Sequence, residues 1–295
     1  MALDLLMHCI LNRIDLILYA VVNLHRQTTT RTFLRTIETS KTKSRTFFAT
    51  YVKSLCVSFD IYDERTIKII SACRGVTSLT FWVVPVTQSL RISTNQFITR
   101  PNNKLAAALS PLRPQRLSVL LHDVLCSPEP QFQLPFFENI THLAIVNRWE
   151  EWTAWSRFHL LPSLTHASFD FRVGPQSLDE AKASMISHAV DDVLASCTHL
   201  RVCVLLLLFD HKPIRTVQAI MKHMIKADSR LVFLRDTEPF RDREAHSTRE
   251  AEIWELAEET VKRQRSGSGL SLFKFFSIDC TLSSPTKLEL TFIEL

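Results

Sequence analysis

The chain has 295 residues, of which 46% are hydrophobic and 22% are charged, a composition that is ordinary for globular proteins and excludes an intrinsically disordered chain. Only four glycines are present, and neither G-x-G-x-x-G nor G-x-x-x-x-G-K-[ST] occurs, which excludes the two common glycine-rich nucleotide-binding loops. The net charge of +5 is a mild basic excess. Aromatic residues do not alternate with the basic ones as they do in RNA-binding motifs, so we expect no nucleic-acid partner.

Residues 5–24 are apolar enough to raise the question of a membrane segment. They include Arg13 and Asp15, and each charge at a bilayer centre costs roughly 2.5–3.5 kcal/mol. The ordered zones of a signal peptide are also missing. The seven cysteines contain no C-x-x-C pair, which argues against a zinc framework and fits free thiols in a reducing compartment. We therefore expect a soluble protein of the cytoplasm or nucleus, with no membrane partner.

A weak internal repeat is the most informative feature of the sequence. An apolar-polar-polar-apolar motif opens strand-like runs at residues 52–55 and 76–79, and again with the same spacing at 140–143 and 164–167. Further strand-like runs lie at 116–121, 200–208 and 231–234. A period of about 20–29 residues with one strand per unit is typical of leucine-rich repeats. The sequence predicts an α/β fold, namely a leucine-rich-repeat-like solenoid with a curved, mainly parallel sheet and helices on its convex side.

Helical signals separate several of these strands. Apolar spacing predicts a helix that begins after Asp63, its N-cap, and ends before Gly75. Capping boxes open two more helices at residues 177–180 and 247–250, and Pro213 suits the first turn of another. In the last helix, we expect three apolar residues to face inward, namely Ile253, Leu256 and Ala257.

Two regions interrupt this alternation of strands and helices. Residues 84–135 contain seven of the twelve prolines, which predicts loops and short elements. Residues 263–269, RQRSGSG, are typical of a flexible linker, and the apolar tail that follows has no helical period, so it is either an added hairpin or a tail outside the fold. The predicted organisation is an N-terminal segment (1–50), a degenerate leucine-rich-repeat-like domain (51–265), and a linker with a C-terminal tail (266–295).

Strand alternation divides the predicted strand residues between two faces of the sheet. The positions expected in the core are Leu55, Val57, Leu79, Phe81, Leu143, Ile145 and Phe169. The opposite face, concave in a solenoid, is the usual binding surface of such proteins. Our candidate protein-binding residues on that face are Ser54, Ser58, Ser78, Trp82, His142, His166 and Asp170. Residues 202–208 are apolar at every position, so their two faces cannot be told apart.

Two further groups have both a structural and a functional interpretation. Trp149, Trp152 and Trp155 recur at helical spacing, and we expect packing, with Trp149 and Trp152 as candidate aromatic anchors for a partner. His142 and His166 occupy equivalent positions of the repeat and would lie on neighbouring strands. We expect a solvent-facing pair rather than a metal site, because two histidines without a third ligand seldom hold zinc.

No catalytic motif is present in the sequence. G-x-S-x-G and H-E-x-x-H do not occur, and the adjacent Asp191 and Asp192 do not face each other on a helix. We therefore expect no enzyme, no cofactor and no bound metal.

Nine short segments carry a resemblance to a known family. In chain order they are LYAVVNL (18–24), FLRTI (33–37), FFATYVKSL (47–55), ISAC (70–73), VTSL (76–79), WTAW (152–155), LLPSLTH (160–166), CTHLRV (197–202) and residues 254–262. In this order the segments resemble those of fungal F-box proteins with degenerate leucine-rich repeats, and the resemblance covers most of residues 15–265. In that family an F-box docks on the Skp adaptor of a ubiquitin ligase, and the repeats present a substrate protein.

The resemblance implies that this chain is the substrate-binding part of a ubiquitin-ligase adaptor whose partner is an unknown protein. The Leu-Pro-rich opening of an F-box is not evident, and only residues 1–14 precede the region of resemblance. We therefore expect residues 1–50 to be a remnant after a truncated F-box, without docking of the Skp adaptor. The alternatives are a truncated, non-functional F-box relative and, less favoured, an unrecognised hydrolase.

Overall fold

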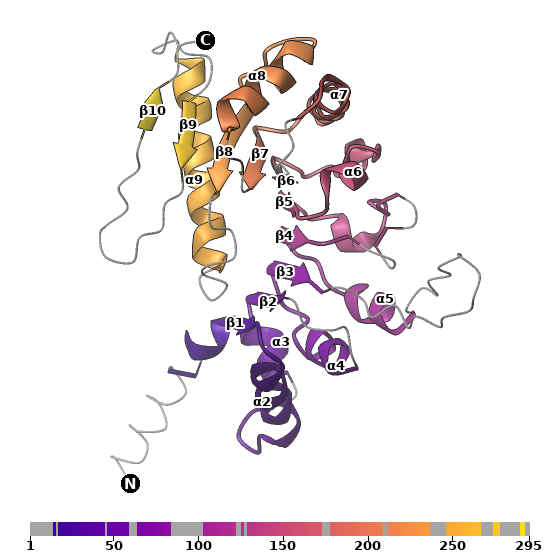
Figure 1. Ribbon diagram of the computed structural model, residues 1–295. Coiled ribbons are helices and arrows are strands. Elements are labelled where there is room, and N and C mark those ends of the chain that lie inside the picture. The colour runs from indigo at the N-terminus through magenta and orange to yellow at the C-terminus, as the bar shows by residue number, and fades with distance from the viewer. Residues whose placement is uncertain are drawn as a thin grey trace, which may run out of the picture. The chain divides into compact units, whose positions relative to one another are not determined.

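The computed structural model describes residues 14–15, 17–44, 46–58, 64–83, 103–121, 125–126, 129–172, 178–208, 210, 212–236, 246–266, 274–277 and 290–292. The chain forms two compact units: the first comprises residues 1–127 and 133–140, and the second comprises residues 128–132 and 141–295. Each unit contains parallel strands connected by helices (Figure 1), so the α/β fold class is confirmed. The boundary near residue 140 falls inside the segment 51–265 that the sequence assigns to one domain.

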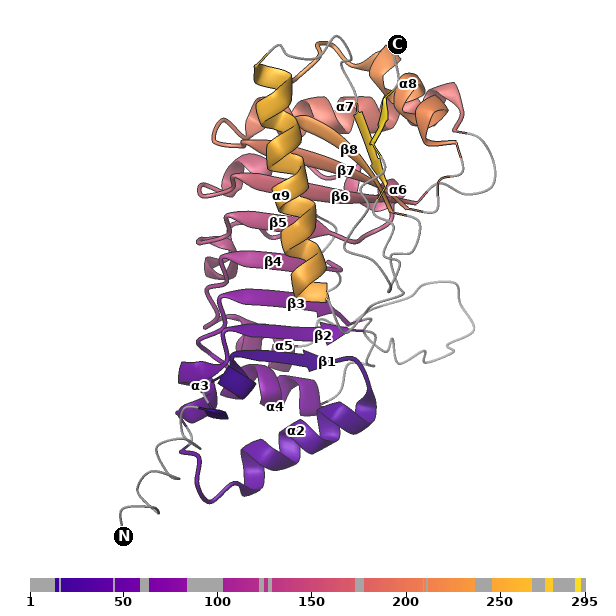
Figure 2. The same ribbon diagram turned by 90° about the vertical axis from the view of Figure 1, so that its left-hand side faces the viewer.

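The first unit is built on four parallel strands, β1 (Val21–Leu24), β2 (Ser54–Ser58), β3 (Ser78–Trp82) and β4 (Arg116–Val119). Equivalent residues of neighbouring strands pair, so Leu55 lies beside Leu79, and Leu79 lies beside Leu117. The helical elements of this unit are α2 (Gln27–Thr39), α3 (Phe47–Tyr51), α4 (Glu64–Ala72), α5 (Asn103–Leu109) and η1 (Pro135–Phe137). Helices α2, α4 and α5 lie on one face of the strands (Figure 2).

The core of the first unit lies between these strands and helices. Leu55 and Leu79 are buried, as predicted for inward strand positions, and Val57 and Phe81 are buried with them. An aromatic cluster closes the core beside β1, where Phe48 meets Phe33 and Tyr19 edge-to-face with ring centroids 5.7 and 5.5 Å apart. Such edge-to-face pairs add to the stabilisation from buried area.

Gly75 lies in the turn between α4 and β3, where the backbone of another segment passes very close. A Cβ atom at this position would lie 2.0 Å from the backbone oxygen of Ala49. Only glycine fits such an approach. The predicted end of this helix before Gly75 is confirmed, because α4 ends at Ala72. The predicted N-cap, Asp63, lies outside the described residues.

The second unit continues the same alternation. Its strands are β5 (His142–Ile145), β6 (His166–Arg172), β7 (Val202–Leu208), β8 (Leu231–Asp236), β9 (Lys274–Ser277) and β10 (Leu290–Phe292). Its helical elements are α6 (Trp149–Trp152), η2 (Phe158–Leu160), α7 (Glu180–Ser196), α8 (Pro213–His223) and α9 (His246–Arg265). Strands β5 to β9 pair in parallel in chain order, and β10 pairs with β9 in the antiparallel direction.

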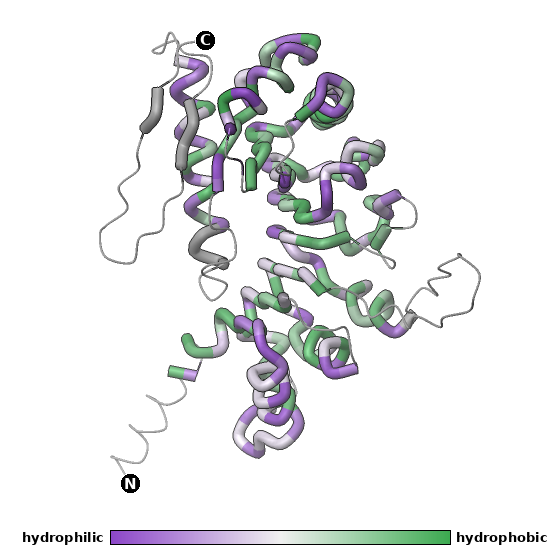
Figure 3. The backbone as a smooth tube through the Cα atoms, in the orientation of Figure 1, coloured by the Kyte–Doolittle hydropathy of each residue, from purple (hydrophilic) through white to green (hydrophobic). Residues whose placement is uncertain are grey.

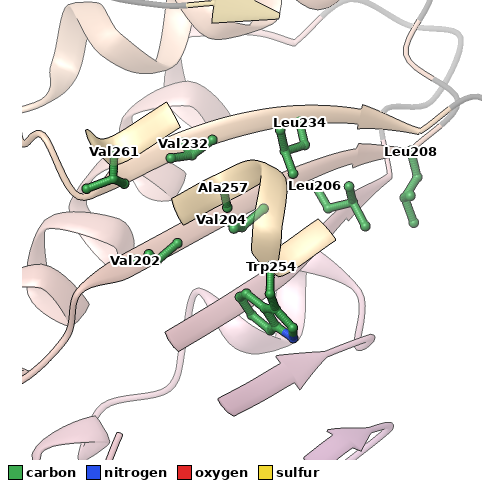
Figure 4. Close-up of a cluster of buried hydrophobic side chains, with 9 residues drawn as sticks. All are labelled: Val202, Val204, Leu206, Leu208, Val232, Leu234, Trp254, Ala257 and Val261. Carbon is green, nitrogen blue, oxygen red and sulfur yellow. The ribbon is translucent and has the colours of Figure 1, made fainter. Parts of the chain in front are cut away.

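Helix α9 lies on the opposite face of the sheet from α7 and α8 (Figure 2). It packs on β7 and β8 through a cluster of buried side chains (Figure 4), namely Val202, Val204, Leu206, Leu208, Val232, Leu234, Trp254, Ala257 and Val261. The expectation that helices cover only one side of the strands is therefore wrong for this unit. The physical reason is that β7 is hydrophobic along its whole length (Figure 3), so both of its faces must be covered.

Several predicted boundaries shift by a few residues. Asp179 is the N-cap of α7 and accepts a hydrogen bond from the Lys182 backbone N–H at 2.8 Å, whereas Ser177 lies outside the described residues. Ser247 lies inside α9 rather than before it. Pro213 opens α8, as predicted. The first three residues of the predicted linker, 263–265, form the last turn of α9. Within the tail, β9 and β10 form an antiparallel pair, which agrees with the added hairpin, one of the two predictions for this segment.

Candidate functional site

The candidate site in the first unit is the strand face turned away from α2, α4 and α5, here called the open strand face. The side chains in the middle of this face, Cys56, Thr80 and Ser118, are buried. Parallel register arranges its residues in rows across the strands, and the row nearest the amino-terminal ends is Val21, Ser54, Ser78 and Arg116. Val21 and Arg116 are exposed, and Ser54 and Ser78 are half-buried. The two predicted serines therefore lie side by side where a partner can reach them.

Trp82 and Ser58 lie further along the open strand face, towards the carboxyl ends of the strands. The half-buried indole of Trp82 reaches across to β4, where its Nε1 donates a hydrogen bond to Ser118 Oγ at 3.0 Å. Ser58 is only 1% exposed, and its hydroxyl lies 2.7 Å from His25 Nδ1. The prediction that Ser58 binds a partner is therefore wrong, because its side chain is buried in a hydrogen-bonded contact.

In the second unit, the predicted face is covered by α9. His142, His166 and Asp170 all lie on that face, but His166 is 5% exposed and Asp170 is 8% exposed. The expectation that His166 and Asp170 face solvent and bind a partner is therefore wrong, whereas His142 is half-buried. The reason is that α9 places Trp254 against both imidazole rings, with ring centroids 5.5 Å from His142 and 5.6 Å from His166.

The two histidines form a stacked pair whose ring centroids are 4.1 Å apart and whose planes differ by 2°. The hydroxyls of Thr141 and Thr165 lie 2.9 and 2.8 Å from the Nδ1 atoms of the histidines that follow them. The repeat explains this geometry, because residues one period apart fall opposite each other in the β5–β6 pairing. The prediction that the histidines occupy neighbouring strands is confirmed.

Glu258 of α9 completes this cluster from the other side. Its Oε1 lies 3.1 Å from His166 Nε2, while the Thr165 hydroxyl donates to the Thr141 backbone oxygen at 3.0 Å. The Thr165 oxygen lies 2.8 Å from His166 Nδ1, so both ring nitrogens of His166 have a hydrogen-bond partner. Because the stacked rings are parallel, their nitrogen lone pairs do not converge on one point. Among the described residues, no group of three or more His, Cys, Asp or Glu side chains could hold a metal ion.

The tryptophans of the predicted aromatic stripe take part in packing. Trp152 is 1% exposed, packs on Phe169 with ring centroids 5.0 Å apart, and donates its Nε1–H to the Asp170 backbone oxygen at 3.0 Å. Trp155 is also buried, and the half-buried Trp149 lies edge-to-face with Phe171. Trp152 is therefore no anchor for a partner, because a partner cannot reach its side chain.

The buried cysteines are free thiols of low reactivity. Burial raises the pKa of Cys73 to about 12 and that of Cys203 to about 12, and burial also raises the pKa of Cys197. A thiol is a nucleophile only in its ionised form. These three side chains therefore contribute to packing and not to chemistry at neutral pH.

Comparisons with known proteins add no assignment to this geometry. No family model, curated protein or solved structure matches the chain. Within the part of the chain that the structure describes, no helix combines the length and the apolar character needed to span a membrane. The open strand face of the first unit and the covered face of the second are thus the features on which a function can be argued.

Proposed function

We propose that this chain is a protein-recognition module of leucine-rich-repeat type, which binds its partner through the open strand face of the first unit. The repeat spacing supports the class of fold. Ser54 pairs with Ser78, and His142 pairs with His166, each across a single repeat period. The pairing of equivalent repeat positions in both units supports a solenoid, a fold whose strand face is the usual binding surface.

The observation that carries the proposal is the row of Val21, Ser54, Ser78 and Arg116. The core of the unit is filled by the alternate residues of the same strands, so the fold does not need these four side chains inside it. Their mixture of hydroxyl, cationic and apolar groups supports binding to a protein chain, whose backbone offers both donors and acceptors.

The proposal is tested by blocking this row and comparing the proteins that the chain captures. In Ser54→Arg/Ser78→Arg, two large side chains project from neighbouring half-buried positions and obstruct the row. The matched control is Ser44→Arg/Ser71→Arg, which adds the same charge and bulk to serines outside the strands of the same unit. Quantitative mass spectrometry of proteins retained from an extract of the source cells, together with circular dichroism of each variant, gives the comparison.

We expect partners that the wild type and the control retain and that the blocked variant loses by about ten-fold or more. Recovery of the same proteins at the same yield by the blocked, folded variant would reject this face as the binding surface. Retention of no protein above background by the folded wild type would count against recognition itself.

The family resemblance extends the proposal to a role in a ubiquitin ligase, with the captured protein as a substrate. This extension has its own measurement, which is co-purification of the wild-type chain with a Skp-type adaptor. A chain that captures a partner through the open strand face but binds no adaptor is a recognition module without that role.

A further inference from the structure

The charge of the chain is divided very unevenly between its two units. Counted along the sequence, the first unit carries 16 Lys and Arg residues against 8 Asp and Glu, a net charge of +8. The second unit carries 19 against 22, a net charge of −3, and the two values add up to the +5 of the whole chain. A basic unit of this size attracts anionic partners over distances of up to about 10 Å at about 0.1 M ionic strength.

The carboxylates in the described part of the first unit are already engaged by cations. In its described part there are four, and each lies within an ion pair: Asp15 with Lys43, Glu38 with Lys68, Glu64 with Lys104, and Glu138 with Arg113. The excess positive charge of the unit is therefore carried by cations that have no carboxylate partner in the described structure. Among these are Lys53, Arg74 and Arg116.

These three cations lie at the amino-terminal edge of the strands of this unit. Lys53 directly precedes β2, Arg74 lies in the turn before β3, and Arg116 is the first residue of β4. Backbone hydrogen bonds align this edge, because Lys53 O accepts from Thr77 N at 2.9 Å and Thr77 O accepts from the Arg116 N–H at 3.0 Å. The amino-terminal ends of β2, β3 and β4 thus each carry an exposed cation. Arg116 belongs to the row of Val21, Ser54 and Ser78, Lys53 is the residue before Ser54, and Arg74 Nε donates a hydrogen bond to the Ser71 backbone oxygen at 3.1 Å.

We propose that the segment recognised by the open strand face is an acidic stretch of a partner protein, which lies across the strands along the edge formed by Lys53, Arg74 and Arg116. This inference rests on the proposed function and names the chemistry of its partner. Carboxylates would meet the cations, the serine hydroxyls would bind backbone groups, and exposed Val21 offers a contact to an apolar side chain.

A peptide fits this edge better than other polyanions do. Single-stranded nucleic acids are held by aromatic side chains on which bases stack, and the only aromatic residue on the described strands of this face, Trp82, is hydrogen-bonded to Ser118. A serine hydroxyl can donate to a phosphate oxygen, but a peptide backbone also offers N–H donors to the acceptor side of the hydroxyl.

The inference is tested by selecting random peptides displayed on phage against the full chain. The variant Lys53→Glu/Arg116→Glu reverses two charges at the edge. The control Arg31→Glu/Arg35→Glu makes the same change in net charge at two exposed positions of α2, which have no carboxylate partner in the described structure. We expect wild type and control to enrich peptides rich in Asp and Glu. We also expect the edge variant to bind those peptides about ten-fold more weakly or worse, and rising salt to weaken the wild type.

Three results would overturn the inference, and they separate it from the proposed function. Selected peptides that are neutral or basic, but lose binding with Ser54→Arg/Ser78→Arg, reject an acidic partner and leave the recognition face standing. Equal loss of acidic peptides in edge variant and control shows that net charge alone, and not this edge, holds them. Tighter binding of an RNA oligonucleotide or of phosphatidylserine vesicles than of any selected peptide reassigns the basic unit to another polyanion. If no peptide is enriched and no cellular protein is retained, the proposed function fails with the inference.

Discussion

His166 Nε2 and Glu258 Oε1 lie 3.1 Å apart although 92 residues separate them in the chain. This contact ties α9 to the polar part of the strand face, over β5 and β6. Over β7 and β8 the same helix is held by the apolar cluster around Ala257 and Val261. The face is thus covered in two chemically different ways, and the apolar part carries most of the stabilisation. Glu258 is half-exposed, and an exposed ion pair contributes only about 0–1 kcal/mol.

Trp254→Ala is expected to weaken the docking of α9 strongly. The indole is 5% exposed and contacts both stacked histidines, and deletion of a buried tryptophan side chain costs about 3–5 kcal/mol. The measurement is hydrogen exchange of the α9 amides together with denaturant unfolding. Glu258→Gln should cost no more than about 1 kcal/mol, since the contact that it weakens is half-exposed.

Trp149→Ala serves as the matched control, because Trp149 belongs to the same unit but is half-buried on α6. It should leave the protection of the α9 amides unchanged. An α9 that exchanges at the same rate in Trp254→Ala and in wild type would contradict the role given to this side chain.

The second prediction concerns the face of β7 under α9. Val204 is fully buried and faces α9, so Val204→Lys places an unpaired charge in an apolar layer. We expect a loss of at least about 4 kcal/mol in the free energy of unfolding. Val21→Lys makes the same change at a 48% exposed position of β1 and should stay within about 0.5 kcal/mol of wild type. Similar stability of the two variants would show that β7 is not covered on both faces.

The sequence was sufficient to predict the strand faces but not what covers them. The spacing of the repeat matched the pairing of Ser54 with Ser78 and of His142 with His166, because a repeat places equivalent residues on neighbouring strands. Which face a helix covers depends on contacts between distant segments, and local periodicity does not report those. The run 202–208 did hold a signal, because a strand that is apolar on both sides requires cover on both sides.

The buried stripe of α9 was predicted one position away from where it lies. The expected set was Ile253, Leu256 and Ala257, whereas the buried apolar residues of this helix are Trp254, Ala257 and Val261. Ile253 and Leu256 are only partly buried, at the rim of the contact. A step of one residue rotates a helix by about 100°, so this shift is enough to hide Trp254 and Glu258, the two residues of the histidine cluster that the sequence did not reveal.

Gly75→Ala is expected to destabilise the first unit. The added Cβ would lie 2.0 Å from the Ala49 backbone oxygen, so either the turn or α3 must move. The cost of such overpacking is about 1–3 kcal/mol, which thermal or denaturant unfolding measures. The neighbouring exposed residue gives the control, since Arg74→Ala should change stability by less than about 0.5 kcal/mol. A Gly75→Ala variant as stable as Arg74→Ala would mean that the Ala49 carbonyl does not approach this turn.

The buried thiols give a prediction on both reactivity and pH. Burial raises the pKa of Cys73 and of Cys203 to about 12 from the ordinary value of 9.0, so both stay protonated in the folded chain at neutral pH. They should react with iodoacetamide only as fast as the protein unfolds, and adding denaturant should make them react at once. Unfolded thiols ionise as pH rises past 9.0 while the folded ones do not, which favours the unfolded state. The contribution of these cysteines to stability is therefore complete below pH 9 and declines as the pH approaches 12. Replacing both by alanine should flatten the fall of unfolding free energy across this range, and an unchanged slope would mean that other groups cause it.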